Sequence, residues 1–308
     1  MNYMQSTNLR STHKTVHIPL TIYLLVTFGG AWLVWLPLLV AEYMHLPLPA
    51  PSIVLIVLGT FVPTITALFL TWRTAGGVEL RWLLGRALVW RVSPIWYVFV
   101  IAGPALLMLL AMGGHVLLGG TAPDYVPFGA RWLLVAVNFV LVLLIGGPLG
   151  EEFGWRGFAL PALETRFSPP WDSLILGFIW AVWHLPLFFI VGSAQHSVPF
   201  GLYLLLTMPL SILITWVYHG SGGSLLLVML FHASVNTWSG PLMISPDAAG
   251  SSRPFALAVI LTWAVALLVV IHTDFQRRCT LRRRGVDSAQ TPAQASVRLA
   301  TAITRLNL

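Results

Sequence analysis

The sequence is poor in charged residues and in cysteine. Only 9% of its 308 residues are Asp, Glu, Lys or Arg, whereas 57% are apolar. Soluble globular domains carry a charge on about a quarter of their residues, so this composition excludes an ordinary soluble protein. The single cysteine, Cys279, lies in a basic stretch near the C-terminus. That position excludes both a disulfide framework and a thiol nucleophile within the apolar sequence.

Long apolar runs make up most of the chain, and each is long enough for a transmembrane helix. The fold class predicted is therefore all-α, a polytopic membrane protein with about eight transmembrane helices. A polar N-terminal segment, 1–16, precedes the transmembrane domain, 17–273, and a basic, disordered tail, 274–308, follows it. The predicted spans are residues 18–40, 52–72, 94–118, 131–165, 173–191, 201–218, 224–244 and 255–272.

The net charge of +7 follows the predicted topology. If the N-terminus is cytoplasmic, 15 of the 17 basic side chains fall inside, and only Arg131 and Arg253 fall outside. This bias predicts that both termini are cytoplasmic. The inside set is Arg10, Lys14, Arg73, Arg81, Arg86, Arg91, Arg156, Arg166, Arg277, Arg278, Arg282, Arg283, Arg284, Arg298 and Arg305.

The basic charge therefore indicates contact with membrane lipids and gives no support to nucleic-acid binding. Residues 73–94, "RTAGGVELRWLLGRALVWRVSP", place arginines among Leu and Trp at helical spacing. This pattern predicts an amphipathic helix on the cytoplasmic surface of the membrane. We expect an integral, multi-pass protein of a bacterial inner membrane.

A few ionisable residues lie deep within the predicted spans. Of ten carboxylates, only Glu151 and Glu152 have long apolar sequence on both sides, in "GEEFGWRGFALPAL" (150–163). Of nine histidines, only His184 and His232 do. A charge in hydrocarbon costs at least about 2.5 kcal/mol unless it is paired or hydrated, so such residues are functional candidates.

Helical spacing brings these residues together. At 1.5 Å per residue, Glu151, His184 and His232 lie roughly 22, 18 and 12 Å from the cytoplasmic ends of three helices. Asn236 shares a helix face with His232, and Glu152 is spaced to form an ion pair with Arg156. Gly146, Gly147 and Pro148, just before the acids, predict a kink that leaves backbone groups for water.

This residue set fits the activation of water. Glu151 and a neutral His184 in a partly dry cavity form a proton-transfer pair that can activate water for attack on an amide. His232 and Asn236 are donors suited to the resulting oxyanion, and no cofactor is required. Alternatively, Glu151, His184 and His232 could bind zinc with an open water position. The sequence does not separate these two mechanisms, although it has no HExxH motif.

A transporter that uses the acids as a proton or ion relay is the competing class. All six polar residues fall between 151 and 236, with none deep in the first 130 residues. A transporter would be expected to repeat its polar site in a second half of the chain, so this distribution disfavours transport. A non-enzymatic immunity protein or scaffold is a further alternative.

Three motifs in order resemble those of the CPBP family of intramembrane proteases. They are E-E-x-x-x-R in "EEFGWR", the histidine of "WAVWH", and H-x-x-x-N in "HASVN". The family includes the Rce1-type CAAX prenyl endopeptidases and the bacteriocin-processing Abi group. The resemblance covers about residues 130–240, which would form the catalytic core.

The resemblance implies roles for individual residues. Glu151 would activate water together with His184, while His232 and Asn236 would stabilise the oxyanion. Glu152 and Arg156 would shape the site. The implied partner is a peptide or protein substrate, lipidated or membrane-associated. The sequence departs from the family pattern at Trp180, where a phenylalanine is expected, and this predicts an altered pocket shape.

Overall fold

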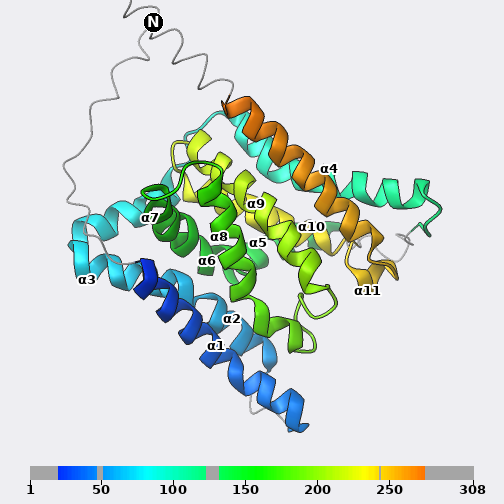
Figure 1. Cartoon of the computed structure of the whole chain (residues 1–308), viewed down its shortest axis with the longest axis horizontal. Coiled ribbons are helices and arrows are strands. Elements are labelled where there is room, and N and C mark those ends of the chain that lie inside the picture. The colour runs from blue at the N-terminus through cyan, green and yellow to red at the C-terminus, as the bar shows by residue number, and fades with distance from the viewer. Residues whose placement is uncertain (1–19, 47–50, 123–131, 243, 275–308) are drawn as a thin grey trace, which may run out of the picture. The chain divides into compact units, whose positions relative to one another are not determined.

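The computed structural model describes residues 20–46, 51–122, 132–242 and 244–274 (Figure 1). Every regular element in these ranges is a helix. In chain order they are α1 (Leu20–Met44), α2 (Ser52–Thr60), α3 (Val62–Gly85), η1 (Arg86–Leu88), α4 (Pro94–Leu117), α5 (Trp132–Ile145), α6 (Pro148–Gly154), η3 (Trp155–Ala159), α7 (Leu160–Glu164), α8 (Trp171–Trp183), η4 (Leu185–Phe189), α9 (Phe200–Gly220), α10 (Leu225–Ser239) and α11 (Pro246–Ala249). A last helix covers Arg253–Asp274.

The chain divides into two compact units, Met1–Trp263 and Ala264–Leu308. The described part of the second unit is the end of the last helix, 264–274. The predicted N-terminal segment 1–16 and all but the first residue of the predicted tail lie outside the described residues. The site residues predicted from the sequence all belong to the first unit.

Among the described residues, six helices are long and apolar enough to cross a membrane, and a bent pair could supply a seventh span. The protein is thus an integral, multi-pass membrane protein, as predicted. Eight spans were predicted, and the one that does not meet the length needed for a full crossing is the seventh, 224–244. Its helix, α10, has 15 residues, fewer than the roughly 17–25 that a full crossing needs.

The predicted kink before the acids is confirmed. The apolar run 131–165 breaks into Leu134–Ile145 and Pro148–Glu164, which are bent by 41° relative to one another. Gly147 lies at the break with a φ of 117°, a conformation that side chains larger than glycine rarely adopt. Pro148 then begins α6 with the fixed φ that suits a first helical position.

The carbonyls around this break are hydrogen-bonded by side chains from other helices. The Thr64 hydroxyl of α3 donates to the carbonyl of Leu149 at 3.0 Å. The Asn236 amide of α10 donates to the carbonyl of Gly146 at 3.4 Å. Such partners are required because a broken helix within a membrane leaves backbone groups without intrahelical bonds.

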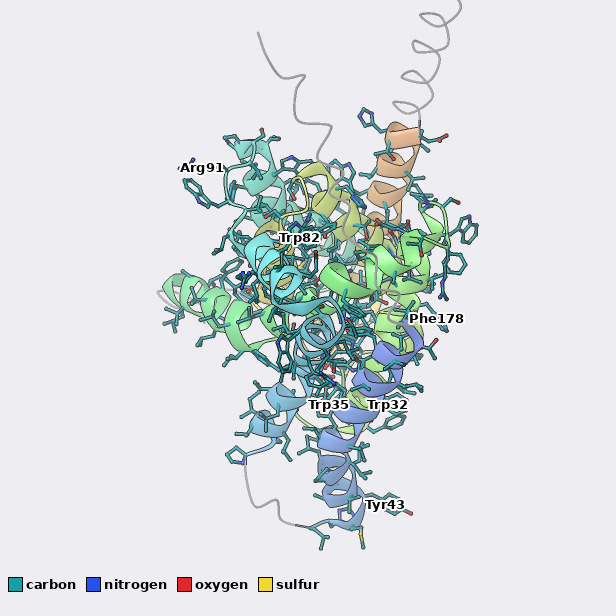
Figure 2. The ribbon with its side chains drawn as sticks, turned by 90° about the vertical axis from the view of Figure 1, so that its left-hand side faces the viewer. Trp32, Trp35, Tyr43, Trp82, Arg91 and Phe178 are labelled. Carbon is teal, nitrogen blue, oxygen red and sulfur yellow. The ribbon has the colours of Figure 1, made fainter. Side chains whose placement is uncertain are left out.

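The predicted amphipathic segment is partly helical. Residues 77–85 continue α3 beyond a kink at Gly76, and η1 follows. The side chains of Trp72, Trp82 and Trp90 are about half exposed. Trp82 and Arg91 lie toward one end of this unit and Tyr43, at the end of α1, lies toward the other (Figure 2). Exposed tryptophans with arginines suit a membrane–water interface.

Buried tryptophans join α1 to the middle of the chain. Trp35 packs against Trp183 at 5.1 Å between ring centroids, and Trp183 packs against Trp155 at 5.6 Å. The indole of Trp32 donates to the carbonyl of Trp183 at 2.9 Å. These contacts fix the C-terminal end of α8, where His184 follows.

Candidate active site

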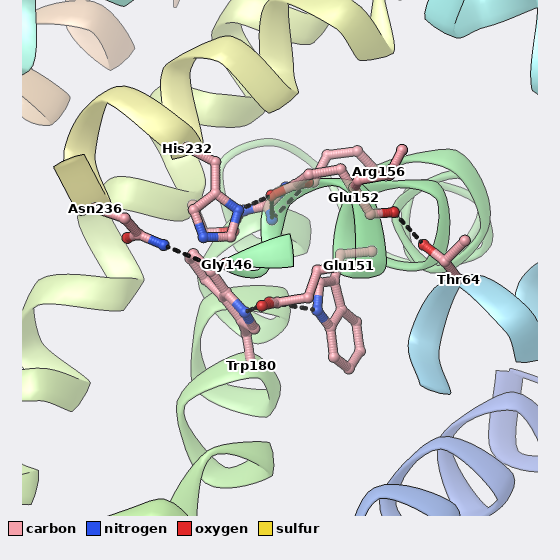
Figure 3. Close-up of polar contacts among 11 residues, drawn as sticks. Thr64, Gly146, Glu151, Glu152, Arg156, Trp180, His232 and Asn236 are labelled. Carbon is pink, nitrogen blue, oxygen red and sulfur yellow. Dashed lines mark hydrogen bonds and ion pairs between the residues drawn. The ribbon is translucent and has the colours of Figure 1, made fainter. Parts of the chain in front are cut away.

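The two adjacent glutamates of α6 face different helices. Glu151 is 2% exposed and faces α8, whereas Glu152 is fully buried and faces α10 (Figure 3). Successive residues of a helix point about 100° apart, so one short helix can serve two neighbours. The acids are therefore held by separate sets of partners.

Glu151 is held by two indole N–H groups. The indole nitrogen Nε1 of Trp180 donates to its Oε2 at 2.6 Å, and that of Trp155 donates to the same oxygen at 3.3 Å. The first bond is short, while the second exceeds the usual range. Across the part of the chain that the structure describes, no arginine, lysine or histidine bonds this carboxylate.

The other oxygen of Glu151 lies against the helix break. A Cβ atom added to Gly147 would come within 2.6 Å of Oε1, which is closer than real contacts allow. Glycine at this position therefore leaves room for the carboxylate. The helix break and the position of the acid are linked, because Gly147 supplies both the turn and the space for the Glu151 carboxylate.

Glu152 forms an ion pair with Arg156, as their spacing predicts. The guanidinium nitrogen Nη1 lies 3.0 Å from Oε2 and 3.1 Å from Oε1, and both side chains are fully buried. Arg156 also donates to the Ser211 hydroxyl of α9 at 3.4 Å. Its guanidinium lies 4.9 Å from the ring centre of Trp180. The ion pair thus offsets part of the free-energy cost of burying Glu152.

His232 is oriented by Glu152. Its Nδ1 lies 2.7 Å from Oε1 of that carboxylate. An ionised carboxylate only accepts hydrogen bonds, so Nδ1 carries the proton and Nε2 is left for other partners. In the neutral ring Nε2 has a lone pair, and it becomes a donor only when the imidazole is protonated.

His184 is oriented by the backbone. It caps the end of α8, and its Nδ1 lies 2.9 Å from the carbonyl of Trp180. A carbonyl accepts only, so here too Nδ1 carries the proton and Nε2 is free to accept one. In both histidines, Nδ1 is bonded and Nε2 is therefore the nitrogen available to take part in a reaction.

The structure brings the predicted site residues together in part. Glu152, Arg156 and His232 form one bonded cluster, and Asn236 lies exposed at its edge, four residues beyond His232. Among the described residues, Glu151 and His184 make no direct hydrogen bond, and the predicted proton-transfer pair stays a prediction. Trp180 links them, since its side chain holds the acid and its carbonyl holds the histidine.

The predicted zinc ligands do not form a metal site in this arrangement. No three His, Cys, Asp or Glu side chains of the described ranges are placed so that they could hold a metal ion. Glu151, His184 and His232 therefore do not fit zinc as they lie. Both histidines nevertheless have Nδ1 bonded to an acceptor, which is the usual environment of a metal-binding imidazole.

Two tryptophans that hold Glu151 were missed as functional residues. Trp155 lies four residues after Glu151, the same spacing that predicts the pair of Glu152 and Arg156, so its contact could have been inferred. Trp180 was noticed only as a change in pocket shape. Its bond to Glu151 spans 29 positions, and helical spacing gives no signal for it.

Helix α1 supports the site from outside this cluster. Tyr23 is fully buried and packs against Trp155 and Phe158, at 5.9 and 4.8 Å between ring centroids. A Cβ atom on Gly154 would come within 2.3 Å of the Tyr23 hydroxyl. The first helix therefore packs directly against the segment that bears the two glutamates.

Comparison with known proteins points to one family. A family model described as type II CAAX prenyl endopeptidase Rce1-like matches residues 131–238. The chain is also similar to CAAX prenyl protease 2 of Methanococcus maripaludis, with 36% identity over 114 residues. That alignment covers 35% of this chain and 42% of the relative, so the chain matches less than half of the relative's length. All six predicted site residues fall within the matched segment.

Proposed function

We propose that this protein is an intramembrane endopeptidase in which Glu151 activates water, because residues 131–238 match the family model of Rce1-like type II CAAX prenyl endopeptidases. One observation carries the assignment. Within the described ranges, Glu151 is a buried carboxylate bonded only by neutral indole donors, whereas its neighbour Glu152 is paired with a cation. A carboxylate without a cation partner remains available to accept a proton.

The proposed reaction begins with a water molecule between Glu151 and His184. Glu151 removes a proton from this water, and Nε2 of His184, which has a lone pair, orients it by accepting its second hydrogen. The hydroxide attacks the carbonyl carbon of the scissile peptide bond and forms a tetrahedral intermediate. Glu151 then returns its proton to the departing amine, so one residue serves as base and then as acid.

His232 and Asn236 are the proposed donors to the oxyanion of the intermediate. His232 would donate from Nε2 when its ring is protonated, and Glu152 holds the ring in place through Nδ1. Asn236 is exposed, and its amide makes only a long bond of 3.4 Å, so it can turn toward a substrate. Glu152 and Arg156 act indirectly, since they fix His232 rather than touch the substrate.

The proposed substrate is a peptide or protein that lies in or on the membrane and carries a lipid. The site residues lie within the apolar helical part of the chain, so we propose that a membrane-attached substrate reaches them without leaving the lipid. The curated relative is named as a prenyl protease, and we propose that this chain also acts on a lipidated C-terminal peptide. The cavity would open toward the cytoplasm.

Substitution of Glu151 tests this function. We expect Glu151→Gln, which keeps shape and hydrogen bonding, to fold normally and to lose nearly all cleavage of prenylated and unprenylated peptides in detergent. Asn236→Ala should lose less, about 10²- to 10³-fold in kcat, as when one oxyanion donor is removed. Cleavage by Glu151→Gln at the wild-type rate would rule out this mechanism.

A zinc-dependent protease is the second candidate, favoured by the bonded Nδ1 atoms of His184 and His232. In that case, zinc would be held by both Nε2 atoms and by Glu151 after a rearrangement, and it would supply an activated water. The metal content of purified protein, and activity after chelation and zinc return, separate the two. Stoichiometric zinc, lost together with activity in His232→Ala, would contradict the metal-free mechanism.

A further inference from the structure

Trp180 contacts four ionisable residues of the site, which are Glu151, His184, His232 and Arg156. Its ring packs edge-on against His232 at 5.2 Å and against His184 at 5.9 Å between centroids, and Arg156 lies over it at 4.9 Å. Its indole N–H bonds Glu151 at 2.6 Å, and its carbonyl bonds His184 at 2.9 Å. The side chain is only 2% exposed. One residue of α8 therefore lies at the centre of the site.

We infer that Trp180 is a positioning residue, whose indole N–H orients the carboxylate of Glu151 for proton transfer by fixing its Oε2. The inference rests on the proposed function of Glu151 as the base. A buried carboxylate needs hydrogen-bond donors to offset its lost hydration. Arg156 cannot supply them, because its two bonds to a carboxylate both go to Glu152.

The bond also defines which oxygen of Glu151 reacts. Both indoles donate to Oε2, so this oxygen is occupied and fixed. Oε1 faces the break at Gly147, and a Cβ on that residue would lie 3.8 Å from Cε1 of His232. Gly147 therefore lies between this oxygen, which makes no hydrogen bond among the described residues, and the His232 ring. We therefore assign proton transfer to Oε1.

A phenylalanine at position 180, which the family pattern expects, would preserve the aromatic contacts and lose the donor. The altered residue was predicted to change the pocket shape, but the hydrogen bond gives it a chemical role. Trp155 serves as a weaker second donor, since its N–H lies 3.3 Å from the same oxygen. Loss of the Trp180 N–H should therefore lower activity more than loss of the Trp155 N–H.

Matched substitutions of three tryptophans test this role. Trp183 lies on the same helix, is fully buried and packs against His184, but its Nε1 has no partner within the described residues. Trp180→Phe should lower kcat about 10- to 100-fold with little change in KM, as expected for a lost bond to a charged group. Trp155→Phe should lose less, and Trp183→Phe least.

A second set of measurements does not depend on activity. In a 15N–1H spectrum of the indole groups, the signal absent from Trp180→Phe should shift in Glu151→Ala and stay in place in Glu42→Ala. If Trp180→Phe does not fold, β-(3-benzothienyl)alanine at position 180 keeps the ring size without the N–H and serves in both assays.

The outcomes separate the inference from the proposed function. Equal kcat for the Trp180 and Trp183 variants, or a Trp180 signal that Glu151→Ala leaves unchanged, would overturn the inference. If the wild type cleaves no peptide, the proposed function fails. The indole signal would then still decide whether Trp180 holds Glu151, and an unmoved signal would refute the inference in its own right.

Discussion

The ion pair of Arg156 and Glu152 is fully buried, so removing the arginine should cost more than removing any surface charge. Arg156→Ala takes away two hydrogen bonds to Glu152, one to Ser211 and the contact with the Trp180 ring. Glu152 would keep only His232 as a bonded partner among the described residues. A buried charge with too few partners is the cause of the expected loss.

The magnitude follows from these contacts. Breaking a buried pair by removing one partner costs about 3–5 kcal/mol, and the remaining bond from His232 places this case near 3. The lost contact between Arg156 and Trp180 adds about 1 kcal/mol. For a chain of this length, a loss of about 4 kcal/mol lowers the midpoint of thermal unfolding by roughly 5–10 °C.

Thermal unfolding of purified protein in detergent measures this shift. Arg166→Ala, which removes an exposed arginine two residues beyond α7, is the matched control. It should have the same midpoint of thermal unfolding as the wild type. The double variant Glu152→Gln/Arg156→Met should be less destabilised than Arg156→Ala, because it leaves no unpaired charge. If Arg156→Ala is as stable as Arg166→Ala but inactive, Arg156 must instead be assigned to substrate binding.

Two further predictions concern the helix break and the topology. Gly147→Ala should abolish cleavage, because its Cβ would crowd Oε1 of Glu151, whereas Gly192→Ala, with a φ of 84° and open space around it, should lose stability only. Thermal unfolding and peptide cleavage of both variants check this, and equal activity would contradict it. Reporter tags inserted at 89–93 or fused at residue 308 should report cytoplasm, and tags at 245–253 the outside. A tag at 308 that reports the outside would overturn the predicted orientation.

Features that depend on local spacing could be predicted from the sequence. The kink was visible in Gly146, Gly147 and Pro148, since two glycines and a proline interrupt an otherwise unbroken apolar run. The pair of Glu152 and Arg156 followed from one helical turn of separation. The apolar runs also gave the positions of most membrane-spanning helices, because their length alone requires them.

Contacts between distant helices could not be predicted. Glu152 and His232 are 80 positions apart, and depth along a helix does not say which acid a histidine will meet. The link between Glu151 and His184 through Trp180, whose side chain bonds the acid and whose carbonyl bonds the histidine, could not be predicted either. Hydropathy treats Trp180 as an apolar ring and overlooks its N–H, so its role was not predicted.

The two adjacent glutamates are not duplicates of one another, and this limits how the protein can change. Each acid depends on partners that only its own direction from α6 can reach: Trp180 for Glu151, and Arg156 with His232 for Glu152. The loss of one acid therefore cannot be rescued by the other, however close it is in sequence. A single-residue insertion between Gly147 and Glu151 would turn both acids by about 100° around the helix axis. Each acid would then face away from its own partners. Descendants of this sequence can vary their lipid-facing surface freely, while the spacing from Gly147 to Arg156 has no tolerance for added or deleted residues.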